Sequence, residues 1–232
     1  MQIIYKNSLR LRVSAVKKNM KFDKGIAKKY RKSIEDAFDV MLEKGTPQQK
    51  RIMTQIYESN MNVRCLPVSI IHASGNTGVI DHRSTNERIE DERLSLNEAL
   101  GEVYITIAEE TIDTGFQRGC EGTFIHEGQH AYDFARVIES FSNTDVNPLS
   151  VFDPTLYELE WAAHKTSGEY MIQIGKDEYL QEGLDLMILE RNDKGIFVSN
   201  EGIKRRLRES YGLEENGNQG SLASQLAGLV QR

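Results

Sequence analysis

The sequence predicts an α+β fold with a small mixed or antiparallel sheet, and three observations support this prediction. Residues 102–108 alternate β-branched and aromatic side chains with period two, which is typical of a strand. Residues 118–141 place apolar residues at helical spacing without a proline, and residues 153–174 combine a helix-start signature with the same spacing. A chain of 232 residues, 39% of them hydrophobic, is long enough to bury a sizeable core.

The chain is expected to divide into three parts. Residues 1–60 form a basic N-terminal helical extension, residues 61–211 one compact domain, and residues 212–232 a flexible tail that follows a glycine-rich break. Helical spacing covers residues 24–44 and 47–60, and Thr46 is placed to cap the second helix.

Charge is distributed unevenly along the chain. Residues 1–32 contain eleven Lys and Arg and one acid, Asp23, whereas the remainder holds 18 basic and 34 acidic residues. Such a basic segment can bind nucleic acid or an anionic membrane, or it can dock on the acidic body of its own chain. Few aromatic residues lie among the basic ones, and the net charge is −6, so docking is favoured and nucleic-acid binding is not expected.

The predicted sheet comes from two regions. Residues 63–73 and 79–82 read as strands on either side of a turn at residues 75–78, which predicts a hairpin. The strand at residues 102–108 is short and is followed by Glu109 and Glu110. These features suit a sheet edge, although an interior strand shows the same alternation.

Two histidines and a glutamate in the following helix point to a metal. His126 and His130 are four residues apart and share a helix face, while Glu127 lies a step of about 100° round the helix. Two core histidines bonded to backbone are the structural alternative, but a pair on one inward stripe beside an acid is hard to satisfy without a metal. Glu127 is then the general base. The other polar residues of this helix are expected mostly off the inward face: Glu121, Gln129, Arg136 and Glu139.

A catalytic zinc site needs a third protein ligand besides water. Asp153 is the expected N-cap of the next helix, with Pro154 at its first position. Glu158 and Glu160 are both close enough along this helix. Glu160 shares a stripe with apolar residues, whereas Glu158 falls on the opposite side, so Glu160 is the predicted ligand.

The sequence His126-Glu127-Gly128-Gln129-His130, followed by Glu160-Trp161-Ala162-Ala163, resembles the gluzincin type of HExxH zinc metallopeptidase over residues 103–174. The resemblance implies a zincin-like fold, peptide hydrolysis, and a sheet-edge strand before the histidine helix on which substrate pairs. Two features depart from related patterns. Many relatives place an Asp three or four residues after the Glu, where this chain has His164, and the extended G-x-x-H pattern of metzincins is absent.

Two further side chains are candidates near the metal. Asp133 could accept the second N–H of a ligating histidine, or it could be a surface acid at the edge of the stripe. His164 could donate a hydrogen bond to a developing oxyanion, or it could be a partly exposed helical histidine.

These observations predict a zinc metallopeptidase with one Zn²⁺ per chain and a peptide or protein substrate. A zinc hydrolase of a non-peptide substrate and a non-catalytic zincin-like binding module remain as alternatives. No apolar run is long enough to span a membrane, and residues 1–5 lack the apolar stretch of a signal peptide, so the expected location is cytoplasmic or reached by another export route. Cys65 and Cys120 are too few for a disulfide framework, and Cys120 is expected to be a buried thiol.

Overall fold

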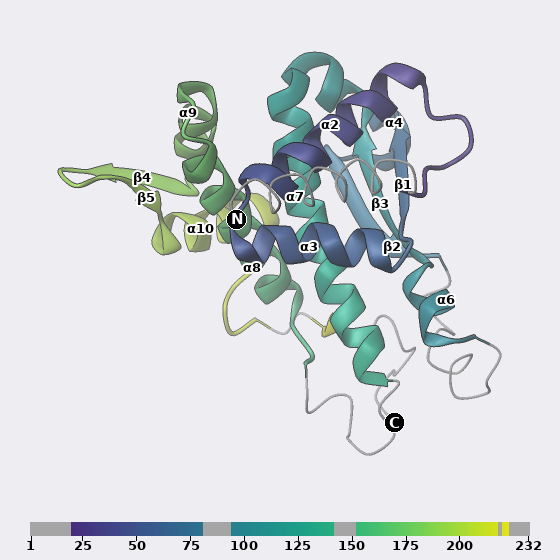
Figure 1. Cartoon of the computed structure of the whole chain (residues 1–232). Coiled ribbons are helices and arrows are strands. Elements are labelled where there is room, and N and C mark those ends of the chain that lie inside the picture. The colour runs from purple at the N-terminus through teal and green to yellow at the C-terminus, as the bar shows by residue number, and fades with distance from the viewer. Residues whose placement is uncertain (1–19, 81–93, 142–151, 218–219, 223–232) are drawn as a thin grey trace, which may run out of the picture.

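The computed structural model describes residues 20–80, 94–141, 152–217 and 220–222. Over these residues the fold is α+β, as predicted, with helices around a small mixed sheet (Figure 1). Helix α7, Glu109–Phe141, runs through the middle of the molecule. The sheet lies on one side of α7, and α8 with the C-terminal elements lies on the other.

Helix α7 is longer than predicted and is buried on most of its sides. It begins at Glu109 rather than at residue 118, and it is kinked at Phe116, whose φ of 51° and ψ of −144° are not helical. Glu109 and Glu110 form its first turn, where acidic side chains interact favourably with the positive end of the helix dipole. The two acids that follow the predicted strand therefore open the helix.

Two polar residues of α7 that were expected mostly off the inward face are buried, because neighbouring helices pack on several sides of α7. Glu121 is 3% exposed and Gln129 is 5% exposed. Glu121 accepts hydrogen bonds from the hydroxyls of Tyr170 at 2.6 Å and Tyr179 at 2.7 Å. Burial, together with these bonds, raises the pKa of both tyrosines, so both hydroxyls remain protonated donors to Glu121.

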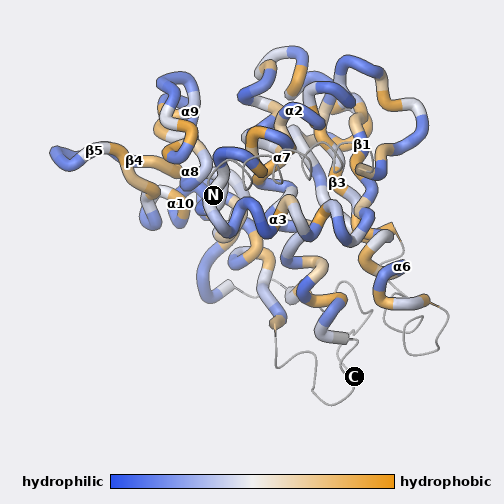
Figure 2. Tube along the Cα trace, in the orientation of Figure 1, coloured by the Kyte–Doolittle hydropathy of each residue, from blue (hydrophilic) through white to orange (hydrophobic). Residues whose placement is uncertain are grey.

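Helices α2, Lys28–Lys44, and α3, Pro47–Glu58, pack on α7. Hydrophobic residues recur between hydrophilic ones along both helices (Figure 2), and their buried residues belong to the same hydrophobic cluster as those of α7. Thr46 caps α3 as predicted, in a capping box with Gln49. The helices expected within residues 1–60 are thus present and share a core with α7. Residues 1–19 lie outside the described part of the chain, so docking of the whole basic segment stays a prediction.

The described sheet has the order β1–β3–β2, with β1 at Asn62–Leu66, β2 at Gly75–Val79 and β3 at Val103–Ala108. Strand β3 pairs with β1 in parallel and with β2 in antiparallel orientation. The prediction of a strand at residues 102–108 is confirmed, but β3 is the central strand and not an edge. Along β2, the described residues pair only with β3.

The predicted hairpin is wrong. After β1 the chain forms the short helix α4, Val68–Ile71, and the four residues expected in a turn are strand residues of β2. A Cβ atom at Gly75 would lie 2.5 Å from Cγ2 of Thr123 and 2.7 Å from Cγ of Glu127. The glycine that suggested a turn therefore allows β2 to approach α7 closely. Helix α6, Leu96–Leu100, precedes β3.

Helix α8, Leu156–Ile174, begins with a cap different from the predicted one. Its N-cap is Thr155 and not Asp153. The Thr155 side chain accepts a hydrogen bond from the backbone N–H of Glu158, and the Glu158 carboxylate accepts one from the Thr155 backbone N–H at 2.7 Å. Two reciprocal bonds satisfy two free N–H groups at once, which a single Asp cap does not do.

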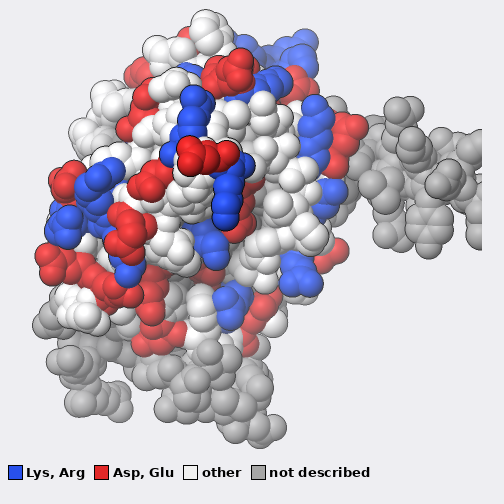
Figure 3. All heavy atoms as spheres, turned by 90° about the vertical axis from the view of Figure 1, so that its left-hand side faces the viewer, with Lys and Arg blue, Asp and Glu red and all other residues white. Residues whose placement is uncertain are grey.

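The C-terminal elements follow α8 in close succession. They are α9 (Asp177–Asp185), β4 (Leu189–Asn192), β5 (Gly195–Val198), α10 (Asn200–Arg206) and the π-helical turn η2 (Leu207–Tyr211). Figure 3 shows the side of the molecule that carries them, with basic and acidic side chains interspersed. No helix in the described ranges is long and apolar enough to cross a membrane.

Part of the predicted flexible tail is packed. Leu213 and Leu222 are 6% and 1% exposed and belong to the main hydrophobic cluster. The N–H of Leu222 donates to the carbonyl of Pro154 at 2.9 Å. Apolar burial thus anchors the described part of residues 212–222, while residues 223–232 lie outside the description.

Candidate metal centre

Side chains from two helices meet between α7 and α8. Nε2 of His126 lies 3.4 Å from Oε2 of Glu160, and Nε2 of His130 lies 3.4 Å from Oε1 of the same carboxylate. The two Nε2 atoms are 3.2 Å apart. This group of three could hold a metal ion. Glu160 faces α7 as the helical stripe predicted, whereas Glu158 is turned to the N-terminus of its own helix.

The spacing of these atoms is compact enough for one ion. The two Nε2 atoms are 3.2 Å apart, close to the roughly 3.3–3.6 Å between ligand atoms around a tetrahedral zinc with ligand distances of about 2.0–2.2 Å. The two 3.4 Å distances end on different oxygens of Glu160, and one ligand atom from each of the three residues lies within 4.8 Å of the others. Two imidazoles and one carboxylate are also the donor types that zinc accepts in catalytic sites. The donor types of these residues therefore fit zinc, and their spacing is close enough for one ion.

The electrostatics of the group favour positive charge at this point. Burial lowers the pKa of His130, but its hydrogen bond with Glu160 and the charges of nearby carboxylates outweigh this effect and raise it. Burial of Glu160 acts in the opposite direction and favours a higher pKa. The bonds of Glu160 with His126 and His130 outweigh burial and hold its pKa well below the usual range. An ionised carboxylate thus faces two imidazoles, an arrangement that attracts a cation.

Glu127 lies beside the group and is held by the edge strand β2. Its side chain is 6% exposed, and the hydroxyl of Thr77 lies 2.7 Å from its Oε2 and 3.0 Å from its backbone carbonyl. Gly75 leaves room for the carboxylate, since an added Cβ would lie 2.8 Å from Oε1. Sequence reasoning missed both Thr77 and Gly75 because it assigned them to a turn.

His164 lies beside the predicted ligands and is 4% exposed, so it is not the partly exposed histidine of the alternative interpretation. Its ring centroid is 4.8 Å from that of His126 and 5.5 Å from that of Tyr211. Its buried Nε2 has no hydrogen-bond partner in the described part of the chain. Burial lowers the pKa of His164, and the charges of His126 and Arg206 lower it further. The imidazole is therefore neutral near pH 7.

Asp133 has a different partner from the one considered in the sequence. It is 3% exposed, which rules out a surface acid, and it accepts a hydrogen bond from Nε2 of Gln129 at 2.9 Å. Gln129 in turn accepts from the Thr166 hydroxyl of α8 at 3.0 Å. Burial raises the pKa of Asp133. Asp133 thus holds Gln129, which links α7 to α8, and its described hydrogen bond is not to a histidine ring.

A pocket of about 570 Å³, called the metal pocket below, opens over His126, Glu127 and Glu160. His164, Arg206 and Tyr211 also line it, and neither Arg206 nor Tyr211 was predicted. Nε of Arg206 is buried and has no hydrogen-bond partner among the described residues. An arginine N–H, a tyrosine hydroxyl and an imidazole can all donate hydrogen bonds, so this wall suits a ligand that carries negative charge. No sequence signal marks Arg206 or Tyr211, because both lie far downstream of the histidine motif.

Comparison with known proteins gives no match to this chain among family models, curated proteins or solved structures.

Proposed function

We propose that this protein is a zinc-dependent metallopeptidase in which His126, His130 and Glu160 bind the ion and Glu127 is the general base. The main support is the close grouping of two imidazoles and a carboxylate, one ligand atom of each lying within 4.8 Å of the others, with a buried glutamate beside them. The resemblance of the sequence to gluzincins agrees with this assignment. A binding module that only held a metal would have no need of Glu127.

Zinc, when bound, supplies a bound water of lowered pKa and polarises the scissile carbonyl. Glu127 takes a proton from the attacking water and later delivers it to the leaving amine. Thr77 holds Oε2 of this carboxylate, which keeps the group oriented through both transfers. His164, Arg206 and Tyr211 line the same pocket, and in this proposal they donate hydrogen bonds to the oxyanion that develops on the carbonyl.

The edge strand β2 supports a peptide as the substrate. It lines the metal pocket through Gly75 and lies beside Glu127. Because its described residues pair only with β3, its other edge can pair with an extended peptide through backbone hydrogen bonds. The sequence suggested that the strand at residues 102–108 pairs with substrate. Because β3 lies between β1 and β2, we assign substrate pairing to β2 instead.

A cleavage assay with a broad peptide library tests the proposal. We expect activity that disappears with a chelator and returns on addition of zinc. The Glu127→Gln variant should lose cleavage by a factor of about 10²–10⁴ or more while it still binds one zinc per chain, since Glu127 is not a ligand. Cleavage that is indifferent to chelator, or a Glu127→Gln protein of full activity, would contradict the assignment. Zinc binding without cleavage of any library peptide would contradict the peptide substrate.

A further inference from the structure

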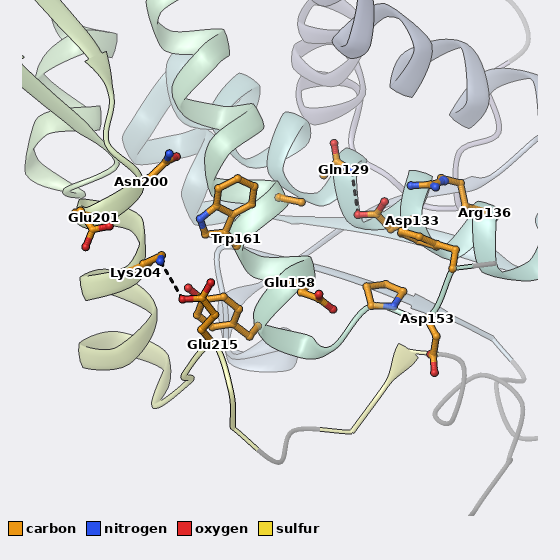
Figure 4. Close-up of a pocket in the computed structure, with 14 residues that line it drawn as sticks. Gln129, Asp133, Arg136, Asp153, Glu158, Trp161, Asn200, Glu201, Lys204 and Glu215 are labelled. Carbon is orange, nitrogen blue, oxygen red and sulfur yellow. Dashed lines mark hydrogen bonds and ion pairs between the residues drawn. The ribbon is translucent and has the colours of Figure 1, made fainter. Parts of the chain in front are cut away.

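A second pocket, of about 820 Å³, lies elsewhere on the same helices (Figure 4). Trp161 lies between Lys204 on one side and Asp133 on the other. The pocket shares no lining residue with the metal pocket, although α7, α8 and α10 contribute to both. Its volume falls within the range of about 300–1,000 Å³ that is usual for ligand sites. We call it the Trp161 pocket.

Aromatic rings line this pocket, and two of these rings contact cationic side chains of the protein itself. Phe152, Tyr157 and Trp161 are among its lining residues. The guanidinium of Arg136 lies 3.6 Å from the ring centroid of Phe152, and Nζ of Lys165 lies 5.1 Å from that of Trp161. The faces of these rings attract cations through their quadrupoles.

The lining is also acidic. Its two basic side chains are Arg136 and Lys204, and Lys204 is paired with Glu215 at 2.9 Å. The carboxylates outnumber them, so the pocket has an excess of negative charge. The acidic lining residues are Asp133, Asp153, Glu158, Glu201 and Glu215.

One buried polar group in the lining lacks a partner. Tyr157 is 5% exposed, and the described part of the chain offers its hydroxyl no hydrogen-bond partner. Burial raises the pKa of Tyr157, so the hydroxyl stays protonated. Such a group destabilises the free protein unless something bonds to it. It is the observation that points to a polar ligand and not merely to an acidic surface.

We propose that the Trp161 pocket binds the lysine or arginine side chain of a peptide. These side chains combine an apolar stem, which packs on aromatic rings, with a cationic end that carries several hydrogen-bond donors. The stem lies against Trp161, the charge lies among the carboxylates, and an N–H donates to the hydroxyl of Tyr157. This site is distinct from the metal pocket and does not depend on hydrolysis.

Trp161 is the only tryptophan in the chain, so its fluorescence reports on this pocket without background. The probes are capped tripeptides with a central Arg, a central Glu or a central Ala, added to the full chain in the presence of a chelator. The Arg peptide should give a saturable change in emission that weakens as salt increases, and the other two should not. Equal responses to all three peptides would overturn the proposal. A response that requires zinc would place the peptide in the metal pocket and overturn it as well.

Two variants separate binding from folding. Glu201→Gln should weaken binding of the Arg peptide about two- to fivefold, as expected for one exposed charge. The matched control is Glu43→Gln on α2, an exposed acid outside the pocket, which should leave binding unchanged.

Tyr157→Phe should raise the melting temperature, because it removes an unpartnered hydroxyl, and at the same time weaken binding. If the Tyr157→Phe protein is more stable and binds the peptide equally well, the hydroxyl of Tyr157 does not bind the peptide, and that part of the proposal is wrong. Binding that appears only after deletion of residues 1–19 would assign the pocket to the chain's own basic segment.

Discussion

The metal pocket and the Trp161 pocket both take lining residues from α7, α8 and α10 but differ in how their polar groups are held. In the metal pocket, Glu127 is 6% exposed and accepts a hydrogen bond from Thr77, and His164 is 4% exposed and packs against the ring of His126. In the Trp161 pocket, most of the carboxylates are at the surface. Buried, preorganised polar groups suit chemistry, whereas an exposed acidic rim over aromatic rings suits reversible binding of a cation.

A single step along a helix decides which pocket a side chain enters. Trp161 lines one pocket and immediately follows Glu160, which lines the other. Gln129 of the Trp161 pocket likewise immediately precedes His130 of the candidate metal group. Consecutive residues on a helix are about 100° apart, so one helix can present unrelated chemistry to two cavities. Matched substitutions in the two pockets therefore test whether they are independent.

The largest difference is expected between Glu160→Ala and Glu158→Ala, since Glu160 lines the metal pocket and Glu158 the Trp161 pocket. Glu160→Ala should weaken zinc affinity by about tenfold or more and abolish cleavage, because it removes one of three protein ligands. Glu158→Ala should leave zinc affinity unchanged and cost about 0.5–2 kcal/mol of stability through loss of the capping box. Zinc titration and thermal melting measure the two effects.

An unaffected Glu160→Ala protein beside a zinc-depleted Glu158→Ala protein would reverse the ligand assignment. Normal zinc binding in both variants would move the search for the third ligand to other residues near the histidines, such as His164.

An intermediate effect is expected from removal of a single hydroxyl in each pocket. Tyr211 is 41% exposed, so Tyr211→Phe should fold normally. If its hydroxyl bonds to the oxyanion, kcat should fall about a hundredfold with zinc content unchanged. Tyr157→Phe makes the same chemical change in the Trp161 pocket and should leave kcat unaltered for a substrate without basic residues. Equal kcat values in the two variants would contradict the role of Tyr211.

The smallest effect is expected when the contact between strand β2 and Glu127 is disturbed. Gly75→Ala would place a methyl group 2.7 Å from Cγ of Glu127 and should displace the carboxylate, lowering kcat about tenfold or more without loss of zinc. Gly78→Ala on the same strand is the control, because its Cβ would meet the side chain of Tyr104 instead, at 2.6 Å from the hydroxyl. A loss of kcat that is as large in the control would show that the strand as a whole, and not its contact with Glu127, is required.

Local patterns in the sequence predicted the elements whose stability is local. The alternation in β3, the capping of α3 by Thr46 and the inward direction of Glu160 all follow from side-chain periodicity or from contacts a few residues apart. The cap of α8 was misplaced by two residues because Asp153 and Thr155 are both good N-caps, and only the bonds between Thr155 and Glu158 distinguish them. The interior position of β3 was not predictable, since strand order depends on partners far away in the chain.

The sequence by itself determined an α+β fold, the placement of His126 and His130 on one helix face, and the direction of Glu160, rather than Glu158, toward that helix. Each depends on the fixed geometry of a single helix or strand. Only the tertiary structure decided that Gly75 and Thr77 form a strand against Glu127, that His164 is buried beside His126, and that Arg206 and Tyr211 complete the pocket. Those contacts join residues dozens of positions apart, and they form because burial of apolar surface brings β2, α7, α8 and η2 together.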